Sequence, residues 1–440
     1  MAHKGDGPGD VAVPRGRLAR FGRMARLATG IAGGMLAEGG RRIVRGDVPR
    51  ARDLLLTPAN ARRLAEQLAT LRGAAMKLGQ LLSMDNGDLL PPELSAILAR
   101  LRSDARAMPR AQLEAALQQA WGKGWRELFA GFEWEPIAAA SIGQVHRAVA
   151  QDGRELALKI QYPGVARSID SDVDNVATLL RLTGLLPRGL DVAPLLAEAK
   201  RQLRAEADYL REAAYMQRFA ALLGDDADFT VPMVDESLTR RKVLAMSFVP
   251  GSSLEGMEGA SQTVRDRIAE LLFQLLFREI FEFRLVQTDP NFANYRYQRD
   301  TRRIALLDFG ATRRYSRRIV AGYRELFQGA LQRDRAGLSA GARAIGYFPD
   351  DLTRGHRDAV LDLFELAAEP LRVAGPYDFA ASDLPARLRE AAMDLGFRSG
   401  YRHNPPADAV FLHRKLGGMY LLAARLGARV DLARIVEQQI

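Results

Sequence analysis

Apolar residues recur at helical spacing through much of the first 130 residues. Between Leu18 and Val44 they form an approximate stripe with arginines beside it. That pattern is typical of a basic helix on a membrane surface, and it fits a solvated helix packed on a core equally well. A second helix is predicted to begin at Thr57-Pro58, because Thr caps helices and Pro fits the first turn. The same period continues from Pro109 to about Phe129.

After Trp134 the pattern becomes that of strands joined by short turns. A turn of small residues comes first and is followed by a strand to Ala148. Residues 151–154 form a hairpin turn, and residues 156–161 are predicted to be the return strand. Residues 230–234 and 242–249 are two further strand-like runs. The small residues of the first turn are Ala138, Ala139, Ala140 and Ser141.

The second half of the chain is predicted to be mainly helical. A long helix is expected over residues 195–222, and it carries Glu206, Asp208 and Glu212. By periodicity alone these acidic residues face solvent. Helical spacing resumes at Ser261 and, after Thr312, runs almost to the end of the chain. Between those stretches lie two polar segments, with a strand-like run before the second.

Composition excludes several kinds of site. The 440 residues include 48% apolar residues, enough for a large core or for two or three domain-sized units. The absence of cysteine excludes disulfides, thiolate metal sites and cysteine nucleophiles. Five histidines argue against a histidine-rich metal centre.

Positive charge is concentrated near the amino terminus. The net charge is +10, and the first 50 residues hold ten Lys or Arg against four Asp or Glu, a local charge of +6. An anionic membrane surface is the expected partner, since no zinc-finger spacing or aromatic-interleaved basic strand favours nucleic acid. No uncharged apolar run approaches the roughly 18–20 residues that span a bilayer, and the amino terminus does not resemble a signal peptide. We therefore expect peripheral rather than transmembrane attachment.

The two polar segments carry the chemistry of phosphoryl transfer. Asp289 and Asn294 stand five residues apart, and Asp308 begins an Asp-Phe-Gly directly after a strand-like run. A carboxylate near the nucleophile, with an Asn and an Asp to hold Mg²⁺, is what transfer from ATP requires. Lys159 lies on the strand beside the small-residue turn, where it can reach a phosphate. The sequence therefore predicts ATP and Mg²⁺ as cofactors.

With these residues in place, the chain resembles the UbiB (ADCK) family of atypical kinase-like proteins, which are linked to ubiquinone biosynthesis. Lys77-Leu-Gly-Gln80 matches the family's Lys-x-Gly-Gln element, with Gly79 and Gln80 completing it, and Glu206-Ala-Asp208 matches its Glu-x-Asp element. The turn at 138–141 matches the Ala-rich loop that replaces a kinase's Gly-rich loop.

The resemblance implies an α+β, protein-kinase-like bilobal fold and a role for each matched residue. A tail (1–17) is followed by a helical extension (18–130), an N-lobe (131–250) and a helical C-lobe (251–440). Glu206 and Asp208 bind Lys77, so that the extension closes as a lid over the nucleotide cleft. The implied nucleotide site combines a phosphate-binding lysine with its carboxylate partner, a catalytic Asp, two metal ligands and two hinge residues: Lys159, Glu212, Asp289, Asn294, Asp308, Met246 and Phe248.

The implied function is Mg·ATP hydrolysis at a membrane surface in support of ubiquinone biosynthesis. The partners would be lipid-like quinone precursors or the enzymes that modify them, on the cytoplasmic side of a bacterial inner membrane or its organellar equivalent. After Gly310 the chain passes almost directly into a helical segment, which leaves little chain for a peptide platform. A small-molecule or lipid kinase and a scaffold without turnover are the alternatives, and the oligomeric state, with a homodimer among the options, stays open.

Overall fold

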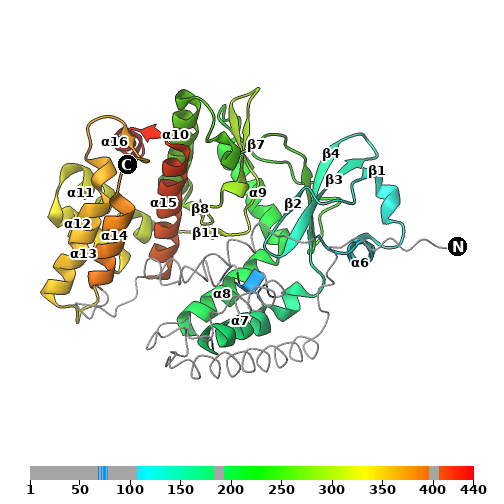
Figure 1. Cartoon of the computed structure of the whole chain (residues 1–440), viewed down its shortest axis with the longest axis horizontal. Helices are drawn as coiled ribbons and strands as arrows, with labels where there is room; N and C mark the ends of the chain where they lie inside the picture. The colour runs from blue at the N-terminus through cyan, green and yellow to red at the C-terminus, as the bar shows by residue number, and fades with distance from the viewer. Residues whose placement is uncertain are drawn as a thin grey trace, which may run out of the picture. The chain divides into compact units, whose positions relative to one another are not determined.

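The computed structural model describes residues 107–182, 193–395 and 406–440, together with six residues between 68 and 77 (Figure 1). The expected tail at 1–17, the helix at 18–44, and the sites at Gly79 and Gln80 lie outside these residues. The described chain divides into two compact units. Unit 1 runs to Arg211 and includes Val234–Phe248, whereas unit 2 comprises Glu212–Met233 and Val249–Ile440.

Unit 1 is built on an antiparallel sheet with the strand order β1-β3-β4-β6. Strand β2 pairs with the first residues of β3, on the same side as β1. The predicted hairpin is confirmed, because β3 and β4 pair in register across a turn in which Gly153 has a positive φ of 85°. The strands are β1 (Phe129–Phe132), β2 (Ala138–Ala139), β3 (Gly143–Ala150), β4 (Glu155–Gln161) and β6 (Val243–Ser247).

The core of unit 1 lies between this sheet and helix α6 (Arg110–Trp121). Leu117 on the helix and Leu158 on β4 are completely buried there, and Trp125 packs in the same cluster. The helix predicted to reach Phe129 ends sooner. Gly122, at φ 87°, closes α6, and a 3₁₀ turn (Trp125–Leu128) leads into β1.

The long helix expected over 195–222 is two helices, which corrects the sequence prediction. After α7 (Val165–Leu182) comes α8 (Ala193–Glu206), and two residues separate it from α9 (Tyr209–Leu223). At the break, the backbone N–H of Tyr209 donates to the carbonyl of Arg241 instead of continuing α8. Periodicity missed the break because apolar residues keep nearly the same spacing on both sides of it.

Unit 2 contains a mixed sheet in the order β5-β10-β9-β7 and a separate β8-β11 pair. The strand predicted at 230–234 ends at Thr230, and only Val234 makes a further bridge. Helix α10 (Gln262–Arg278) and a π turn (Glu279–Phe283) lead into β8. The strands are β5 (Phe229–Thr230), β7 (Ser252–Ser253), β8 (Leu285–Gln287), β9 (Tyr295–Gln298), β10 (Arg303–Leu306) and β11 (Thr312–Arg314).

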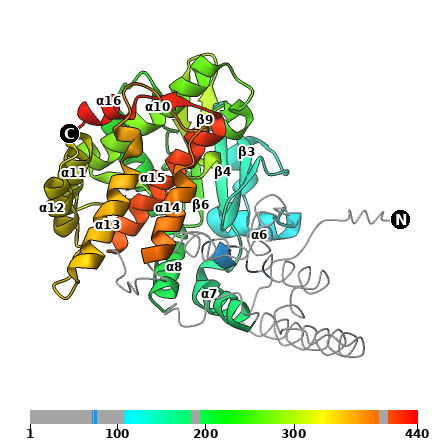
Figure 2. The same ribbon diagram turned by 60° about the vertical axis from the view of Figure 1, so that its left-hand side comes forward.

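The predicted carboxyl-terminal helices are confirmed, apart from the small β12 (Tyr377–Asp378) and β13 (Arg429–Val430) pair. Helices α10 and α15 lie side by side in both views (Figures 1 and 2). Among the described residues, no helix combines the length and apolar character needed to cross a membrane. The helices are α11 (Arg317–Gln332), α12 (Arg335–Ile345), α13 (Arg354–Ala367), α14 (Leu384–Met393), α15 (Ala407–Leu426) and α16 (Leu432–Glu437).

Candidate functional site

The loop that follows β8 brings Asp289 and Asn294 together in unit 2. Asn291 accepts a hydrogen bond from the backbone N–H of Ala293 at 3.1 Å and so caps a 3₁₀ turn, Phe292–Asn294. That turn lets Nδ2 of Asn294 donate to the carbonyl of Asp289 at 3.1 Å, and it lies 3.5 Å from Asp289 Oδ2. The loop is thus closed by its own side chains.

Asp308 joins this loop through the strand that precedes it. The N–H of Leu307, just past the end of β10, donates to the carbonyl of Asn294 at 2.9 Å. Asp308 Oδ1 accepts from the N–H of Gly310 at 2.9 Å, which fixes the carboxylate against its own turn. The three residues that the sequence singled out therefore lie on two connected segments of one unit.

The residue set fits a magnesium ion that also binds phosphates. Because the amide nitrogen of Asn294 donates to Asp289, its oxygen is the atom that can face a cation. Mg²⁺ in nucleotide sites takes one or two protein ligands beside phosphate oxygens and waters, which matches one amide oxygen and one carboxylate. Among the described residues, no cluster of three or more His, Cys, Asp or Glu side chains is placed to hold a metal.

Glu212 and Phe309 anchor the Asp-Phe-Gly turn in the core of unit 2. Phe309 is 1% exposed, and its ring centroid lies 4.9 Å from that of Phe219 on α9. Its N–H donates to Glu212 Oε1 at 3.4 Å, and Glu212 is fully buried. Glu212 thus supports the metal-binding segment, a contact that the sequence did not suggest. The expected Lys159–Glu212 ion pair joins residues of different units and stays a prediction.

Two largely buried cations on α15 contact the loop, and sequence reasoning missed both. Nη2 of Arg414 lies 2.5 Å from Asp289 Oδ1, and the Arg414 side chain is 9% exposed. Lys415, 2% exposed, donates to Gln287 Oε1 at 3.2 Å and to the Tyr295 hydroxyl at 2.7 Å. In sequence, consecutive basic residues on a helix are usually solvated. The sequence feature that could have indicated this contact is the pair of glycines, Gly417 and Gly418, in the middle of the same helix.

A buried carboxyl completes this cluster. Glu279 Oε2 lies 3.9 Å from Lys415 Nζ, and both side chains are 2% exposed. Burial raises the pKa of the Glu279 carboxyl to about 7, against the opposing effect of the Lys415 charge. Lys415 keeps its proton, because the neighbouring Tyr295 and Glu279 raise its pKa despite burial.

In unit 1 the small-residue turn is the tip of the β2–β3 hairpin. Ala138 and Ala139 are exposed, and Ala140 closes the turn by donating its N–H to the carbonyl of Gly143 at 2.9 Å. Lys159 lies on β4, where it pairs across the sheet with Val145 on β3. Its side chain is 6% exposed, and Nζ lies 5.4 Å from the centre of the Tyr209 ring.

The helical segment that carries Lys77 is fastened to the same hairpin tip. Lys77 forms an ion pair with Glu206, whose other oxygen accepts from the Ser141 hydroxyl at 3.2 Å. A Cβ added at Gly73 would lie 3.1 Å from the Ser141 carbonyl oxygen and 3.1 Å from a methyl group of Ile142. The backbone at Gly73 therefore rests directly on the tip of the hairpin.

Asp208 does not share this ion pair, contrary to the sequence expectation. Its Oδ2 lies 3.4 Å from Arg241, and its Oδ1 accepts from the N–H of Arg211 in the first turn of α9. The physical reason is the break between α8 and α9. Glu206 is the last residue of one helix and Asp208 caps the next, so the two carboxylates point to different partners.

The predicted hinge residues lie at the end of β6. Met246 is 5% exposed and pairs with Ala157 on β4. The N–H of Phe248 donates to the carbonyl of Glu155 at 2.9 Å, and the guanidinium of Arg147 lies 4.7 Å from the centre of the Phe248 ring. Both are thus held by the sheet edge, and their contact with a nucleotide stays a prediction.

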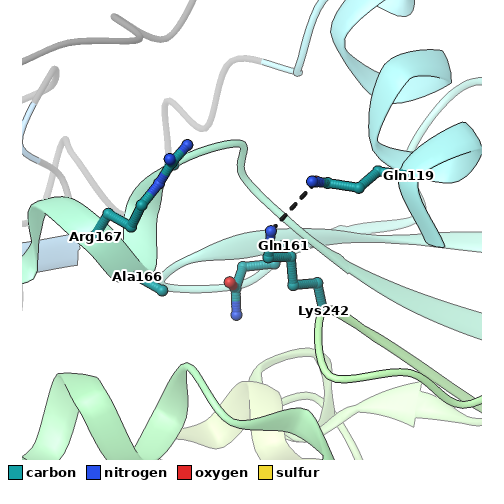
Figure 3. A pocket seen from close by; sticks show the side chains of 6 residues that line it. Gln119, Gln161, Ala166, Arg167 and Lys242 are labelled. Carbon is teal, nitrogen blue, oxygen red and sulfur yellow. Dashed lines mark hydrogen bonds between the residues drawn. The ribbon is translucent and has the colours of Figure 1, made fainter.

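A small hollow in unit 1 is lined by a different set of residues. It has a volume of about 190 Å³, less than the roughly 300 Å³ at which ligand pockets begin. In Figure 3, Lys242 spans its edge, with Nζ 3.2 Å from Gln119 Oε1. None of the expected nucleotide residues lines it; the lining residues are Gln119, Gln161, Gly164, Ala166, Arg167 and Lys242.

Comparison with known proteins places this site in a family. Residues 100–341 match the ABC1 atypical kinase-like domain. The chain is 40% identical over 425 residues to the atypical kinase COQ8B, mitochondrial, of Rattus norvegicus, covering 95% of this chain and 79% of that protein. It is 37% identical over 430 residues to the atypical kinase COQ8, mitochondrial, of Saccharomyces cerevisiae, covering 97% of this chain and 85% of the relative.

A solved structure shares the fold. The complex of Rv3197 with erythromycin from Mycobacterium tuberculosis aligns with a TM-score of 0.58 and 25% identity, over 87% of this chain and 96% of that one. The predicted α+β, kinase-like fold is confirmed by this likeness and by the domain match. The resemblance drawn from the sequence motifs is also confirmed, since the relatives are COQ8 atypical kinases of ubiquinone biosynthesis. The chain belongs to the ABC1 family of atypical kinase-like proteins.

Proposed function

We propose that this protein binds Mg·ATP and hydrolyses it in support of ubiquinone biosynthesis. The observation that carries the proposal is the closed arrangement of Asp289, Asn294 and Asp308, in which hydrogen bonds tie the catalytic loop to the start of the Asp-Phe-Gly turn. The family match supports kinase-like chemistry in general. Asp289, Asn294 and Asp308 are the residues to which we assign that chemistry in this chain.

Each residue has a role that follows from its chemistry. Lys159, which lies on β4, neutralises charge on the phosphates, and Glu212 orients the Lys159 side chain. Asn294 and Asp308 hold the metal ion, which when bound supplies charge neutralisation on the phosphates. Asp289 orients water or accepts its proton. Ala138, Ala139, Ala140 and Ser141 cover the phosphates, and Met246 and Phe248 contact the base.

The element formed by Lys77, Gly79 and Gln80 acts as a lid over the nucleotide. The supporting observation is its ion pair with Glu206 beside the hairpin tip. Asp208 contributes by capping α9 and so fixing the helix break that aims Glu206 at Lys77. Such a lid excludes a peptide and is compatible with a lipid-like quinone precursor or a partner enzyme as the client.

An assay with ATP labelled on the γ-phosphate tests the proposal. With and without candidate polyprenyl phenols, we expect the label to be released as free phosphate, and we expect Asp289→Asn to abolish this release. Label in the phenol would instead identify a small-molecule kinase, the first alternative. No release and no transfer, with nucleotide bound, would identify a scaffold and refute the proposed turnover.

We also propose a peripheral location on a membrane, on the cytoplasmic side in bacteria or in the organellar equivalent. The support is the +6 charge of the first 50 residues and the mitochondrial relatives. Each basic residue near an anionic surface contributes about 1 kcal/mol, so vesicles with anionic lipid should sediment the protein in a salt-dependent manner. Deleting residues 1–45 should weaken that binding. Equal sedimentation with neutral and anionic vesicles would refute it.

A further inference from the structure

Helix α15 contacts the catalytic loop along one face. Arg414 pairs with Asp289 within the loop, and Lys415 binds the residues on either side of it, Gln287 and Tyr295. One turn further along the helix, a Cβ at Gly418 would lie 2.2 Å from Cγ of Pro290, so the helix backbone touches the loop. A carboxyl-terminal helix therefore shapes a loop that precedes it by more than 100 residues.

The loop itself contains no cation that could balance the charge of Asp289. The segment from Gln287 to Asn294 has neither Lys nor Arg. A nucleotide's terminal phosphate, bound at Asn294 and Asp308, would face the negative charge of Asp289 as well. Phosphoryl-transfer sites place a guanidinium or ammonium group beside the phosphates and the catalytic carboxylate. In some of them this group comes from a distant part of the same chain. Arg414 is the cation that the structure places on Asp289.

Arg414 has donors to spare for a second anion. A guanidinium carries five N–H groups in a fixed plane, which allows it to bridge two acceptors. Within the described residues, Nη2 is the only Arg414 nitrogen with a hydrogen-bond partner, namely Asp289 Oδ1. The side chain is 9% exposed and so is already held in place, without the entropy cost of ordering a free surface arginine.

We propose that Arg414 binds the terminal phosphate of the nucleotide while it remains paired with Asp289. The inference rests on the proposed binding of Mg·ATP, and it assigns a phosphate ligand outside the family's matched motifs. Arg414 then neutralises charge on the group that is transferred and aligns Asp289 beside it. Lys415, by contrast, touches only the protein and serves as a positioning residue.

The two possible roles of Arg414 differ in what they do to nucleotide preference. If Arg414 only supports the loop, its loss weakens ATP and ADP binding alike, since both nucleotides use the same metal site. If it touches the terminal phosphate, its loss affects the triphosphate alone, because ADP lacks that group. The ratio of the two affinities therefore separates a phosphate ligand from a structural ion pair.

The test measures dissociation constants of Mg²⁺ complexes of ADP and of a non-hydrolysable ATP analogue by calorimetry on the full chain. A charged hydrogen bond contributes about 1.5–3 kcal/mol, so Arg414→Gln should weaken binding of the ATP analogue at least about tenfold. ADP affinity should stay within about twofold. Arg414→Lys keeps the charge but loses the planar fork, so its affinity for the ATP analogue should lie between those of the parent and of Arg414→Gln. Arg278→Gln is the matched control, because Arg278 on α10 is also a shielded arginine of unit 2 but pairs with Asp226, outside the loop.

A double variant guards against loss of the fold and isolates the phosphate contact. Asp289→Asn with Arg414→Gln leaves no unpaired charge at the loop, and it should still lose the preference for the triphosphate relative to Asp289→Asn alone. An unchanged ratio of affinities in Arg414→Gln, in Arg414→Lys and in the double variant would overturn the inference. So would an equal loss for both nucleotides. Binding without hydrolysis in the parent chain would refute only the proposed turnover, whereas a parent that binds neither nucleotide would refute both.

Discussion

Replacing Lys77 by Ala should release the helical segment that it fastens. The Lys77 side chain is 5% exposed and that of Glu206 is 14% exposed, so the ion pair is largely shielded from water. Without Lys77, the Glu206 carboxylate would keep the Ser141 hydroxyl, 3.2 Å away, and a limited contact with solvent. A shielded carboxylate that loses its cation favours any local opening that exposes it.

The burial of the pair sets the size of the effect. Removing one partner of a buried pair costs about 3–5 kcal/mol, and exposed pairs contribute about 0–1 kcal/mol. Because Glu206 retains some solvent and one hydroxyl, we expect a cost of about 2–4 kcal/mol. If that cost falls on local opening, the open population rises about 30- to 1,000-fold.

Hydrogen exchange at residues 73–77 measures this opening directly. Exchange there should accelerate in Lys77→Ala, while the amides of β4 keep their protection. Lys200→Ala is the matched control. Lys200 also lies in unit 1 and pairs with Asp174 at 2.6 Å, but the side chains are 22% and 56% exposed. Its loss should change exchange by less than about fivefold, as expected for a pair worth under 1 kcal/mol.

A double-mutant cycle decides whether the two residues act together. Glu206→Ala should accelerate exchange in the same segment, and the double variant should be less damaged than the sum of the singles by at least about 1 kcal/mol. Additive effects, together with unchanged exchange at residues 73–77, would refute the fastening role. Activity in the cell should fall in both single variants, although every phosphate and metal ligand is intact.

Three further predictions concern unit 2. Asp308→Asn should remove most Mg²⁺-dependent nucleotide binding, measured by calorimetry, whereas Asp289→Asn should keep binding and lose turnover; hydrolysis at the parent rate in Asp289→Asn would contradict the assignment of the loop. Gly418→Ala should cost about 1–3 kcal/mol in urea unfolding and slow turnover, because its Cβ overlaps Pro290. Gly417→Ala, with open space at its Cβ, should instead stabilise by about 0.5–1 kcal/mol, and equal effects would contradict the close approach. Because burial raises the Glu279 pKa from 4.5 to about 7, the folded chain holds a proton that the unfolded chain loses over that range, and this stabilisation is lost as the pH rises through about 7. Glu279→Gln should remove that loss, so its advantage in unfolding free energy over the parent should grow from about pH 5 to pH 8, and a constant difference would contradict the buried carboxyl.

The sequence predicted those parts of the fold that local chemistry determines. The β3–β4 hairpin was visible because apolar alternation flanks a turn with Gly153, whose φ of 85° an L side chain rarely adopts. Asp289, Asn294 and Asp308 were visible because a phosphoryl-transfer site uses fixed residue types at fixed spacing. The Lys77–Glu206 contact was reached only through resemblance to a family, since periodicity places both residues on solvated faces.

What the sequence left out depends on packing between distant segments. Lys415 lies 128 residues from Gln287, and Arg414 lies 125 residues from Asp289, so no local pattern connects them. The break after Glu206 was hidden for a related reason: the backbone bond from Tyr209 to Arg241 comes from a partner more than 30 residues away. Such contacts are selected by the whole fold and leave no spacing to detect.

Glycine inside a helix was the local sequence feature that accompanied two of these distant contacts. A mid-helix glycine costs about 0.5–1 kcal/mol relative to alanine, so it persists where something else requires the missing side chain. At Gly418 that requirement is Pro290 of the catalytic loop, and at Gly73 it is the tip of the β2–β3 hairpin. In both cases the helix that carries the glycine also carries a buried cation within four residues, Arg414 or Lys77, paired with a carboxylate. Close backbone approach shields the ion pair, and the ion pair holds the helix where its glycine fits. The two features therefore support each other at each site, and losing either one should weaken the other.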